Sequence, residues 1–305
     1  MDVSVITINY NNALLTVNFV KSVLAVTTSK LKYEVIVVDN ASSKEDYIIL
    51  NEVINNKDGV RLIKSKINLG FGGGNMLGVQ YASGKYLAFI NNDIVFKEDC
   101  LNSLFSFMNE NKNVGVVTPQ QLNKDGNPVS CFDYFHGIRK EILGRKFVEL
   151  FLPKNRDRRE NKQYTKTCCA DFIQGCFMFF DINSFAQVGG FDTNIFLYYE
   201  EMDICFRLKK EGLKSCLHPE TKFLHYHGVS TGKNFAIKKE LQISYLYVIK
   251  KNYSYLKYLT IKSIVLFKLF FKSIVSPRYF ELFFTVLTES YLQKSLKLKQ
   301  KIQLE

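Results

Sequence analysis

The stretch YLAFINNDIVF, residues 86–96, decides how the sequence is interpreted. Its apolar part, 86–90, is typical of a buried strand, and the strand ends abruptly in Asn91, Asn92 and Asp93. Asn and Asp favour turns because their side chains hydrogen-bond to nearby backbone, so a plain turn explains this tip when it is taken alone. A functional site is the other interpretation, and the rest of the chain decides between the two.

Short apolar runs and helical patterns alternate around this stretch. Alternation of this kind predicts an α/β fold, with a mostly parallel, doubly wound sheet flanked by helices. Strands are predicted at 3–8, 34–38, 60–64, 86–90, 114–118 and 172–180, and helices at 13–26, 44–56, 72–83, 98–112 and 198–211.

Polar residues gather where the first four predicted strands end. In open α/β sheets, ligands bind in the crevice at the carboxyl ends of the strands. One polar tip is a turn, but several at the same edge predict a site, which favours a functional role for Asp93. The tips are 9–12, 39–40, 68 onward and 91–93.

The composition suits one large domain, or one domain with an appendage. The chain has 305 residues, of which 47% are hydrophobic. Because MDVSVITINYNN enters a strand pattern without a basic region, and no uncharged apolar run is long enough to span a bilayer, we expect neither a signal peptide nor a spanning helix. Seven Cys in no zinc or disulfide-framework spacing predict a reducing cytoplasm and free, mostly buried thiols.

The positive charge is concentrated near the end of the chain. Residues 245–305 hold 11 Lys or Arg against three Glu, which is two thirds of the net charge of +12. A basic tail indicates an anionic partner: a membrane, a nucleic acid or a polyanionic substrate. Residues 262–287 mix apolar residues with regular Lys around Pro277. They predict either helices on a membrane surface or a partner chain, or a helical pair packed on the preceding domain.

The segment INLGFGGGNMLG, residues 67–78, is rich in glycine between a strand and a helix. It has neither the position of a dinucleotide fingerprint nor the Gly-Lys-Ser/Thr of a P-loop. Its glycines allow close backbone approach, and the helix N-terminus favours an anion such as a diphosphate. A tight strand-to-helix turn is the alternative.

Three acids begin the predicted helix in FLYYEEMDICFRLKKEG, residues 196–212. Glu200, Glu201 and Asp203 complement the helix dipole, but they also repel one another, which favours a role as a general base or beside a metal. Arg207 follows Asp203 by four positions and can neutralise one charge.

Two histidines occupy alternate positions of the extended segment LHYHGVSTG, residues 224–232. A lone His is more often structural than a ligand, but a divalent ion held by Asp93, a His and two phosphate oxygens is chemically reasonable. The irregular segment 123–170 predicts either a mobile loop over the site or a solvated insertion.

Taken together, these segments resemble glycosyltransferase family 2 enzymes of the GT-A fold, close to the bacterial rhamnosyltransferase-type members. The resemblance covers roughly residues 3–235. It implies a catalytic domain at 1–235, with a nucleotide-sugar half at about 1–120 and an acceptor half at 121–235. A basic aromatic helical tail follows at 236–305. The resemblance rests on VSVITINYNN, VIVVDNASSKED, NLGFGGGNMLG, FINNDI, GGFDTNIFLYYEEMDICFRLKKEG and HYHGVS, in that order.

The resemblance implies roles for individual residues. Asp93 matches the second Asp of the family's Asp-x-Asp motif, with Asn91 in place of the first, and would hold Mg²⁺ or Mn²⁺ on a diphosphate. His225 would complete the metal shell, with His227 in reserve. Glu201 takes the place of the family's base, and Glu200 and Asp203 are alternatives. The implied donor-binding residues are Thr7, Asn9, Asn11, Asp39, Asn68, Gly70, Gly73, Asn75, Asn91, Asn92 and Asp93.

The implied reaction is an inverting transfer from a nucleoside-diphosphate sugar, dTDP-rhamnose first and a UDP-sugar next. The acceptor would be a glycan or a lipid-linked sugar in cell-surface polysaccharide synthesis, such as capsule or O-antigen. We expect the protein at the inner face of the plasma membrane, with peripheral membrane contact, a homodimer through the C-terminal helices and no nucleic-acid partner.

Two other functions stay open at this point. A sugar nucleotidyltransferase would carry a basic glycine-rich loop near residue 10, and NYNNALLTV has neither feature. A non-enzymatic polyanion- or glycan-binding protein would use the basic tail, but it leaves the acids at 200–203 unexplained.

Overall fold

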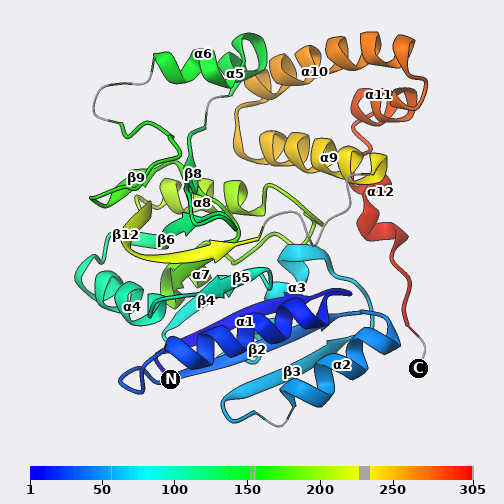
Figure 1. Ribbon diagram of the computed structural model, residues 1–305. Coiled ribbons are helices and arrows are strands. Elements are labelled where there is room, and N and C mark those ends of the chain that lie inside the picture. The colour runs from blue at the N-terminus through cyan, green and yellow to red at the C-terminus, as the bar shows by residue number, and fades with distance from the viewer. Residues whose placement is uncertain (56, 136, 152, 154–155, 227–233, 304–305) are drawn as a thin grey trace.

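The computed structural model describes residues 1–55, 57–135, 137–151, 153, 156–226 and 234–303. A mixed, mostly parallel sheet crosses the molecule and helices flank it, which confirms the predicted α/β class (Figure 1). Its strand order is β3-β2-β1-β4-β11-β6-β12-β5. These strands are β1 (Val3–Asn9), β2 (Tyr33–Asn40), β3 (Val60–Ser65), β4 (Tyr86–Ile90), β5 (Ile94–Phe96), β6 (Val114–Leu122), β11 (Phe177–Asp181) and β12 (Lys214–His225).

Alternate residues of the strands supply two hydrophobic clusters, one on each face of the sheet. In β2, Val35 and Val37 belong to the first cluster, and Ile36 and Val38 belong to the second. Because such strands are buried on both faces, they are continuously apolar and can be recognised in the sequence. The first cluster packs against α1 (Ala13–Val26), α2 (Lys44–Ile54) and α4 (Cys100–Glu110), and the second against α3 (Gly70–Val79), α7 (Ile182–Gln187) and α8 (Glu200–Lys210).

The segment 123–170 contains regular structure that its sequence did not predict. Its Cys131, Phe132 and Tyr164 are buried in the second cluster. The strand predicted at 172–180 is divided around Gly175, because its first part pairs with β8 and its second part pairs with β4. The elements are β7 (Pro128–Val129), β8 (Phe132–Asp133), α5 (Ile138–Leu143), α6 (Arg145–Leu150), β9 (Cys168–Ala170) and β10 (Phe172–Ile173).

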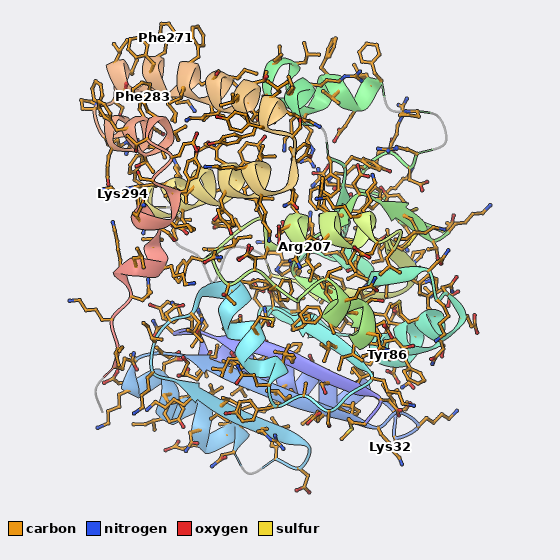
Figure 2. The ribbon with its side chains drawn as sticks, turned by 180° about the vertical axis from the view of Figure 1, so that it is seen from behind. Lys32, Tyr86, Arg207, Phe271, Phe283 and Lys294 are labelled. Atoms are coloured by element: carbon orange, nitrogen blue, oxygen red, sulfur yellow. A yellow bond between two sulfur atoms is a disulfide. The ribbon has the colours of Figure 1, made fainter. Side chains whose placement is uncertain are left out.

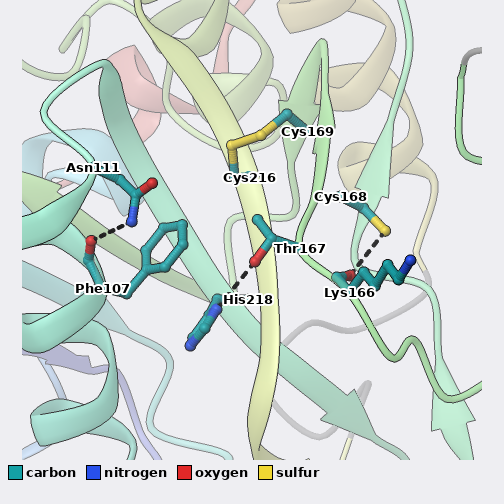
Figure 3. Close-up of a disulfide and its surroundings, with 8 residues drawn as sticks. All are labelled: Phe107, Asn111, Lys166, Thr167, Cys168, Cys169, Cys216 and His218. Atoms are coloured by element: carbon teal, nitrogen blue, oxygen red, sulfur yellow. Dashed lines mark hydrogen bonds between the residues drawn. A yellow bond between two sulfur atoms is a disulfide. The ribbon is translucent and has the colours of Figure 1, made fainter.

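A disulfide joins Cys169 of β9 to Cys216 of β12 (Figure 3). The expectation of free thiols is therefore wrong for this pair, while the other five Cys are free and buried. The two residues lie 47 positions apart in the chain, and the antiparallel pairing of β9 with β12 brings their Cα atoms to 4.0 Å. Pairing between distant strands leaves no trace in cysteine spacing, so the sequence could not reveal this bond.

The tail forms a helical layer that is packed on the rest of the chain. A third cluster joins Ile195 and Met202 to residues of the last helices, and Pro277 separates two of these helices as predicted. Within the described ranges, none of the helices combines the length and the apolar character that a membrane crossing requires. The elements are α9 (Phe235–Asn252), α10 (Tyr255–Val275), α11 (Tyr279–Leu287), α12 (Tyr291–Lys294) and η1 (Leu296–Lys299).

Candidate active site

Two cavities adjoin each other beside the carboxyl end of β4. The first has a volume of about 300 Å³ and the second a volume of about 510 Å³. Phe71, Asn91 and Leu197 line both, so the two cavities share a wall. This location agrees with the general rule for open α/β sheets.

The glycine-rich turn forms one wall of the first cavity. The amide nitrogen of Asn40 donates to Oδ1 of Asn68 at 3.0 Å and to the carbonyl of Gly70 at 3.1 Å. Gly70 has φ +74°, and a Cβ there would lie 2.1 Å from the carbonyl oxygen of Phe196. Only glycine fits this close backbone approach.

Asn75 presents an unsatisfied amide in this wall. It lines the first cavity, it is 2% exposed, and its Nδ2 has no hydrogen-bond partner among the residues that the structure describes. A buried donor without a partner is costly unless a ligand supplies the acceptor. Asn92 also lines this cavity, although its Nδ2 donates to Oγ1 of Thr16 at 2.9 Å.

A hydrogen-bond network at the ends of β1 and β2 holds three further residues of the predicted donor site, of which Asn9 and Asp39 are buried and Asn11 is exposed. Nδ2 of Asn9 lies 3.0 Å from Oδ1 of Asp39 and 2.7 Å from Oδ2 of Asp46. Oδ1 of Asn11 accepts from the backbone of Ser43 at 2.7 Å. These side chains hold the loops that follow β1 and β2. Of the predicted donor residues, Thr7, Asn9, Asn11, Asp39 and Gly73 line neither cavity.

The second cavity contains the predicted metal ligands. Nε2 of His225 lies 3.1 Å from Oδ1 of Asp93, and its Nδ1 lies 3.2 Å from Nε2 of Gln121. Burial lowers the pKa of His225, but Cys176 and Asp93 raise it by more. The net result is a pKa of about 10. Nε2 of His225 can therefore donate to Oδ1 of Asp93. The second predicted histidine, His227, lies outside the described residues.

The donor set fits a divalent ion that shares its ligands with a substrate. In the part of the chain that the structure describes, no three His, Cys, Asp or Glu converge on a metal position. Mg²⁺ is typically held by one or two carboxylates together with substrate phosphates and water. The Asp93 oxygen and the His225 nitrogen are therefore suitable ligands for Mg²⁺ or Mn²⁺ when phosphates supply the remainder.

A strained turn aims two of the predicted acids into the second cavity. Helix α8 begins at Glu200, two residues later than predicted, because Tyr198 and Tyr199 adopt left-handed backbone with φ 72° and 71°. Such strain in non-glycine residues gathers at functional sites. Glu200 and Glu201 both line the second cavity.

Burial perturbs both of these carboxyl groups. The pKa of Glu201 is raised to about 7. Burial is the largest cause, backbone hydrogen bonds oppose it, and the nearby Asp133 adds to it. Burial and the neighbouring Glu201 raise the pKa of Glu200 well above its usual range. A carboxyl group with a pKa near neutrality is suited to take a proton from a hydroxyl.

The third predicted acid lies elsewhere. Asp203 is fully buried and accepts from Nε and Nη2 of Arg207 at 3.0 and 2.6 Å, and from Nδ2 of Asn252 at 2.8 Å. Nζ of Lys251 lies 3.0 Å from the same carboxylate. Asp203 thus ties α8 to α9, and it is absent from the lining of both cavities.

The segment 123–170 contributes cations to the second cavity that sequence reasoning missed. Lys140, Arg145 and Arg159 line it, together with Asp133, to which Arg145 is hydrogen-bonded. Nε of Arg159 donates to the carbonyl of Phe132 at 3.1 Å. The charge-rich composition of this segment was the only signal, because its residues follow no strand or helix period.

Comparison with known proteins identifies the family. The family model described as Glycosyl transferase family 2 matches residues 4–183, more than half of the chain. The chain belongs to glycosyl transferase family 2. It is a glycosyltransferase, as the sequence motifs predicted, and the nucleotidyltransferase and binding-protein alternatives lose their support.

Similar proteins agree with this assignment. Rhamnosyltransferase WbbL of Escherichia coli (strain K12) is 27% identical over 229 residues, which are 72% of this chain and 83% of that protein. The low-salt glycan biosynthesis hexosyltransferase Agl10 of Haloferax volcanii is 26% identical over 216 residues, which are 70% of this chain and 63% of that protein. This glycosyltransferase therefore spans less than two thirds of Agl10.

A solved structure supports the GT-A fold. The crystal structure of GalNAc-T7 with UDP, GalNAc and Mn²⁺ aligns with a TM-score of 0.60 at 17% identity. The alignment covers 82% of the glycosyltransferase described here and 48% of the GalNAc-T7 chain. At this identity, the likeness shows the fold alone.

Proposed function

We propose that the enzyme binds a nucleoside-diphosphate sugar in the first cavity and transfers its sugar, with inversion, to an acceptor in the second. One observation carries the proposal: Asn91 lines both cavities, and Asp93 and Glu201 line the second. A diphosphate beside Asp93 would therefore place the sugar between the two cavities.

Asparagine amides and the glycine-rich turn would bind the donor. Asn40, Asn68, Asn75 and Asn91 line the first cavity, and the unsatisfied Nδ2 of Asn75 is aimed at a ligand. The close approach of Gly70 to Phe196 fixes the position of this turn, which lines the first cavity. Asn9, Asn11 and Asp39 would shape the nucleoside pocket by fixing the loops behind it.

Asp93 and His225 would hold Mg²⁺ or Mn²⁺. When bound, the ion would neutralise the negative charge of the departing nucleoside diphosphate. The imidazolium of His225 must lose its proton before its Nε2 can act as a ligand. His227 stays the alternative metal ligand that the sequence predicts.

Glu201 would act as the base. Its carboxylate takes the proton of an acceptor hydroxyl, whose oxygen attacks the anomeric carbon on the face opposite the diphosphate. The new C–O bond forms as the bond to the diphosphate oxygen breaks, and its electron pair leaves with the diphosphate. Glu200, whose pKa is raised, would stay protonated and uncharged in the wall of the second cavity. Asp203 would anchor helix α8.

Similarity to WbbL supports a rhamnosyl donor, so we place dTDP-rhamnose first and a UDP-sugar next. We assign residues 1–235 to the catalytic domain and 236–305 to the helical tail. The acceptor would be a glycan or a lipid-linked sugar in cell-surface polysaccharide synthesis, and the enzyme would work at the inner face of the membrane. The homodimer stays a prediction.

The test is thermal stability against nucleoside diphosphates and nucleotide sugars, with and without Mn²⁺. A ligand that binds only the folded state stabilises it by about 2.7 kcal/mol at ~100 times its Kd. We expect a Mn²⁺-dependent rise in Tm with one nucleotide class, lost in Asp93→Asn and kept in the control Asp125→Asn, which alters an exposed loop. A folded protein that responds to no nucleotide would reject the donor site.

A further inference from the structure

Two short helices of the segment 123–170 turn their apolar residues to solvent. Helix α5 has no buried residue at all. Ile142 is 64% exposed, Leu150 is 65% exposed and Phe151, which follows α6, is 69% exposed. Exposed apolar side chains grouped in this way are typical of an interaction surface and not of an ordinary solvent-exposed surface.

Helix α10 is apolar on two opposite faces. Its buried face carries Tyr258, Ile261, Val265 and Leu269 at helical spacing and packs in the third cluster. The opposite face carries the exposed Leu256, Phe267, Phe270, Phe271 and Ile274. Among the described residues, the first face packs in the third cluster, whereas on the second face Phe270 contacts Phe283 and the side chains stay largely exposed, which favours another apolar environment.

The exposed faces of α5, α6 and α10 lie along one edge of the molecule. Figure 1 shows these helices in a row along that edge, and Figure 2 shows Phe271 at its outer limit. Nζ of Lys268 in α10 donates to the carbonyl of Glu141 in α5 at 2.6 Å, which joins the two helices. Helix α11 continues the surface with the exposed Phe280 and Phe284.

We propose that residues 138–151 and 255–287 form one docking face for an anionic lipid bilayer, hereafter the lipid face. Charge favours a bilayer over a protein partner as its occupant. Arg139, Lys257, Lys272 and Arg278 are cations of these same segments, and basic residues beside an exposed apolar helix face are typical of helices that lie in a membrane interface. Residues 138–151, hereafter the insertion, would therefore contact the membrane together with the C-terminal tail.

The lipid face adjoins the second cavity. Lys140 of α5 and Arg145 of α6 line that cavity, while Leu143 and Phe147 of the same helices are exposed. One pair of helices therefore borders both the bilayer and the catalytic groups. This step rests on the proposed function: an acceptor anchored in the bilayer would reach Glu201 without leaving the lipid.

The test is co-sedimentation of the full chain with vesicles. We compare equal mixtures of phosphatidylglycerol and phosphatidylcholine with phosphatidylcholine alone. The insertion variant is Leu143→Ser/Phe147→Ser/Leu150→Ser. The matched control, Leu14→Ser/Ile48→Ser/Ile49→Ser, removes three exposed apolar residues from α1 and α2 at the opposite end of the molecule (Figure 1).

We expect the wild type and the control to bind the anionic vesicles, and the insertion variant to bind at least about tenfold more weakly. Phe267→Ser/Phe271→Ser/Ile274→Ser on α10 should weaken binding likewise, so a misfolded insertion variant does not end the test. Wild type that stays in the supernatant, or variants that bind like the control, would overturn the proposal. So would a lipid-free dimer, seen by light scattering, that the insertion variant dissociates.

The failure of the lipid face is distinguishable from failure of the proposed function. The insertion variant changes no residue assigned to the donor or the metal, so its Mn²⁺-dependent rise in Tm with nucleotide should equal that of the wild type. Vesicle binding without any nucleotide response would reject the donor site alone, and a nucleotide response without vesicle binding would reject the lipid face alone.

Discussion

Nε2 of His225 lies 3.1 Å from Oδ1 of Asp93, and both side chains are more than nine-tenths buried. Against the effect of burial, Cys176 and Asp93 raise the pKa of this histidine to about 10, which favours a proton on the Nε2 that faces Asp93. The same two atoms are the candidate ligands of a divalent ion. If the ion binds as proposed, we expect it to replace the proton between these two atoms.

Replacing His225 by Ala tests this exchange. The change leaves the Asp93 carboxylate buried without its partner, which should destabilise the metal-free protein by about 3 kcal/mol in urea unfolding. Mn²⁺ affinity measured in the presence of nucleotide should fall by about 10- to 100-fold. His218→Ala is the control, because His218 is also buried but lines neither cavity. Equal losses in the two variants would reject a metal role for His225.

The pKa of Glu201 predicts the pH dependence of the reaction. A general base works as a carboxylate, so kcat/KM should rise as pH increases through about 7 and level off above it. Glu201→Gln should lower kcat by a factor of about 10² to 10⁴, with nucleotide binding unchanged, and should remove this rise.

Glu200→Gln separates the two neighbouring acids. If Glu201 is the base, this variant keeps the ascending limb of the pH profile and a substantial kcat. If the limb disappears in Glu200→Gln and persists in Glu201→Gln, the two roles are exchanged.

Asp203 should behave as a structural residue. Asp203→Asn leaves the cations of Arg207 and Lys251 without the buried carboxylate they share, so it should cost about 3 kcal/mol of stability. It should not produce the loss of kcat, about 100-fold or more, that removal of a base gives. Asp192→Asn is a matched comparison: its carboxylate also pairs with Lys251, at 2.7 Å, but its side chain is 12% exposed whereas that of Asp203 is fully buried, so the loss should be smaller. A folded but inactive Asp203→Asn would restore this residue as a candidate base.

The sheet could be predicted because burial on two faces leaves a local signature. VIVV is apolar at every position and VSVITI at four of six, as is typical of strands covered by helices, and both are strands in the structure. The segment 123–170 had no such signature. Its helices α5 and α6 are six residues each, and most of their apolar residues are exposed, so they show no periodic pattern directed at a core.

The candidate site was predictable only where its residues follow a strand. Asn91 and Asp93 stand directly after β4, and the topology brings that end to the cavities. Lys140 and Arg159 reach the same cavity from a segment whose path depends on tertiary packing. The division between Glu201, which faces the cavity, and Asp203, which faces Arg207, follows from where the helix begins. The left-handed backbone of Tyr198 and Tyr199 determines where the helix begins. Tyrosine rarely adopts this conformation, so the sequence does not predict it.

Gly70 and Gly59 provide a controlled test of the donor turn. Both have φ +74°, so alanine at either position carries the same left-handed backbone penalty of about 1–2 kcal/mol. A Cβ at Gly59 meets nothing within 4 Å, whereas a Cβ at Gly70 would overlap the carbonyl oxygen of Phe196. Gly70→Ala should therefore lose more stability than Gly59→Ala and should also weaken nucleotide binding, because the turn must move away from the residues that line both cavities. Isothermal titration with the nucleotide found in the thermal screen measures the second effect. If the two alanine variants bind that nucleotide equally well, the close approach at Gly70 serves packing alone and the first cavity does not depend on it.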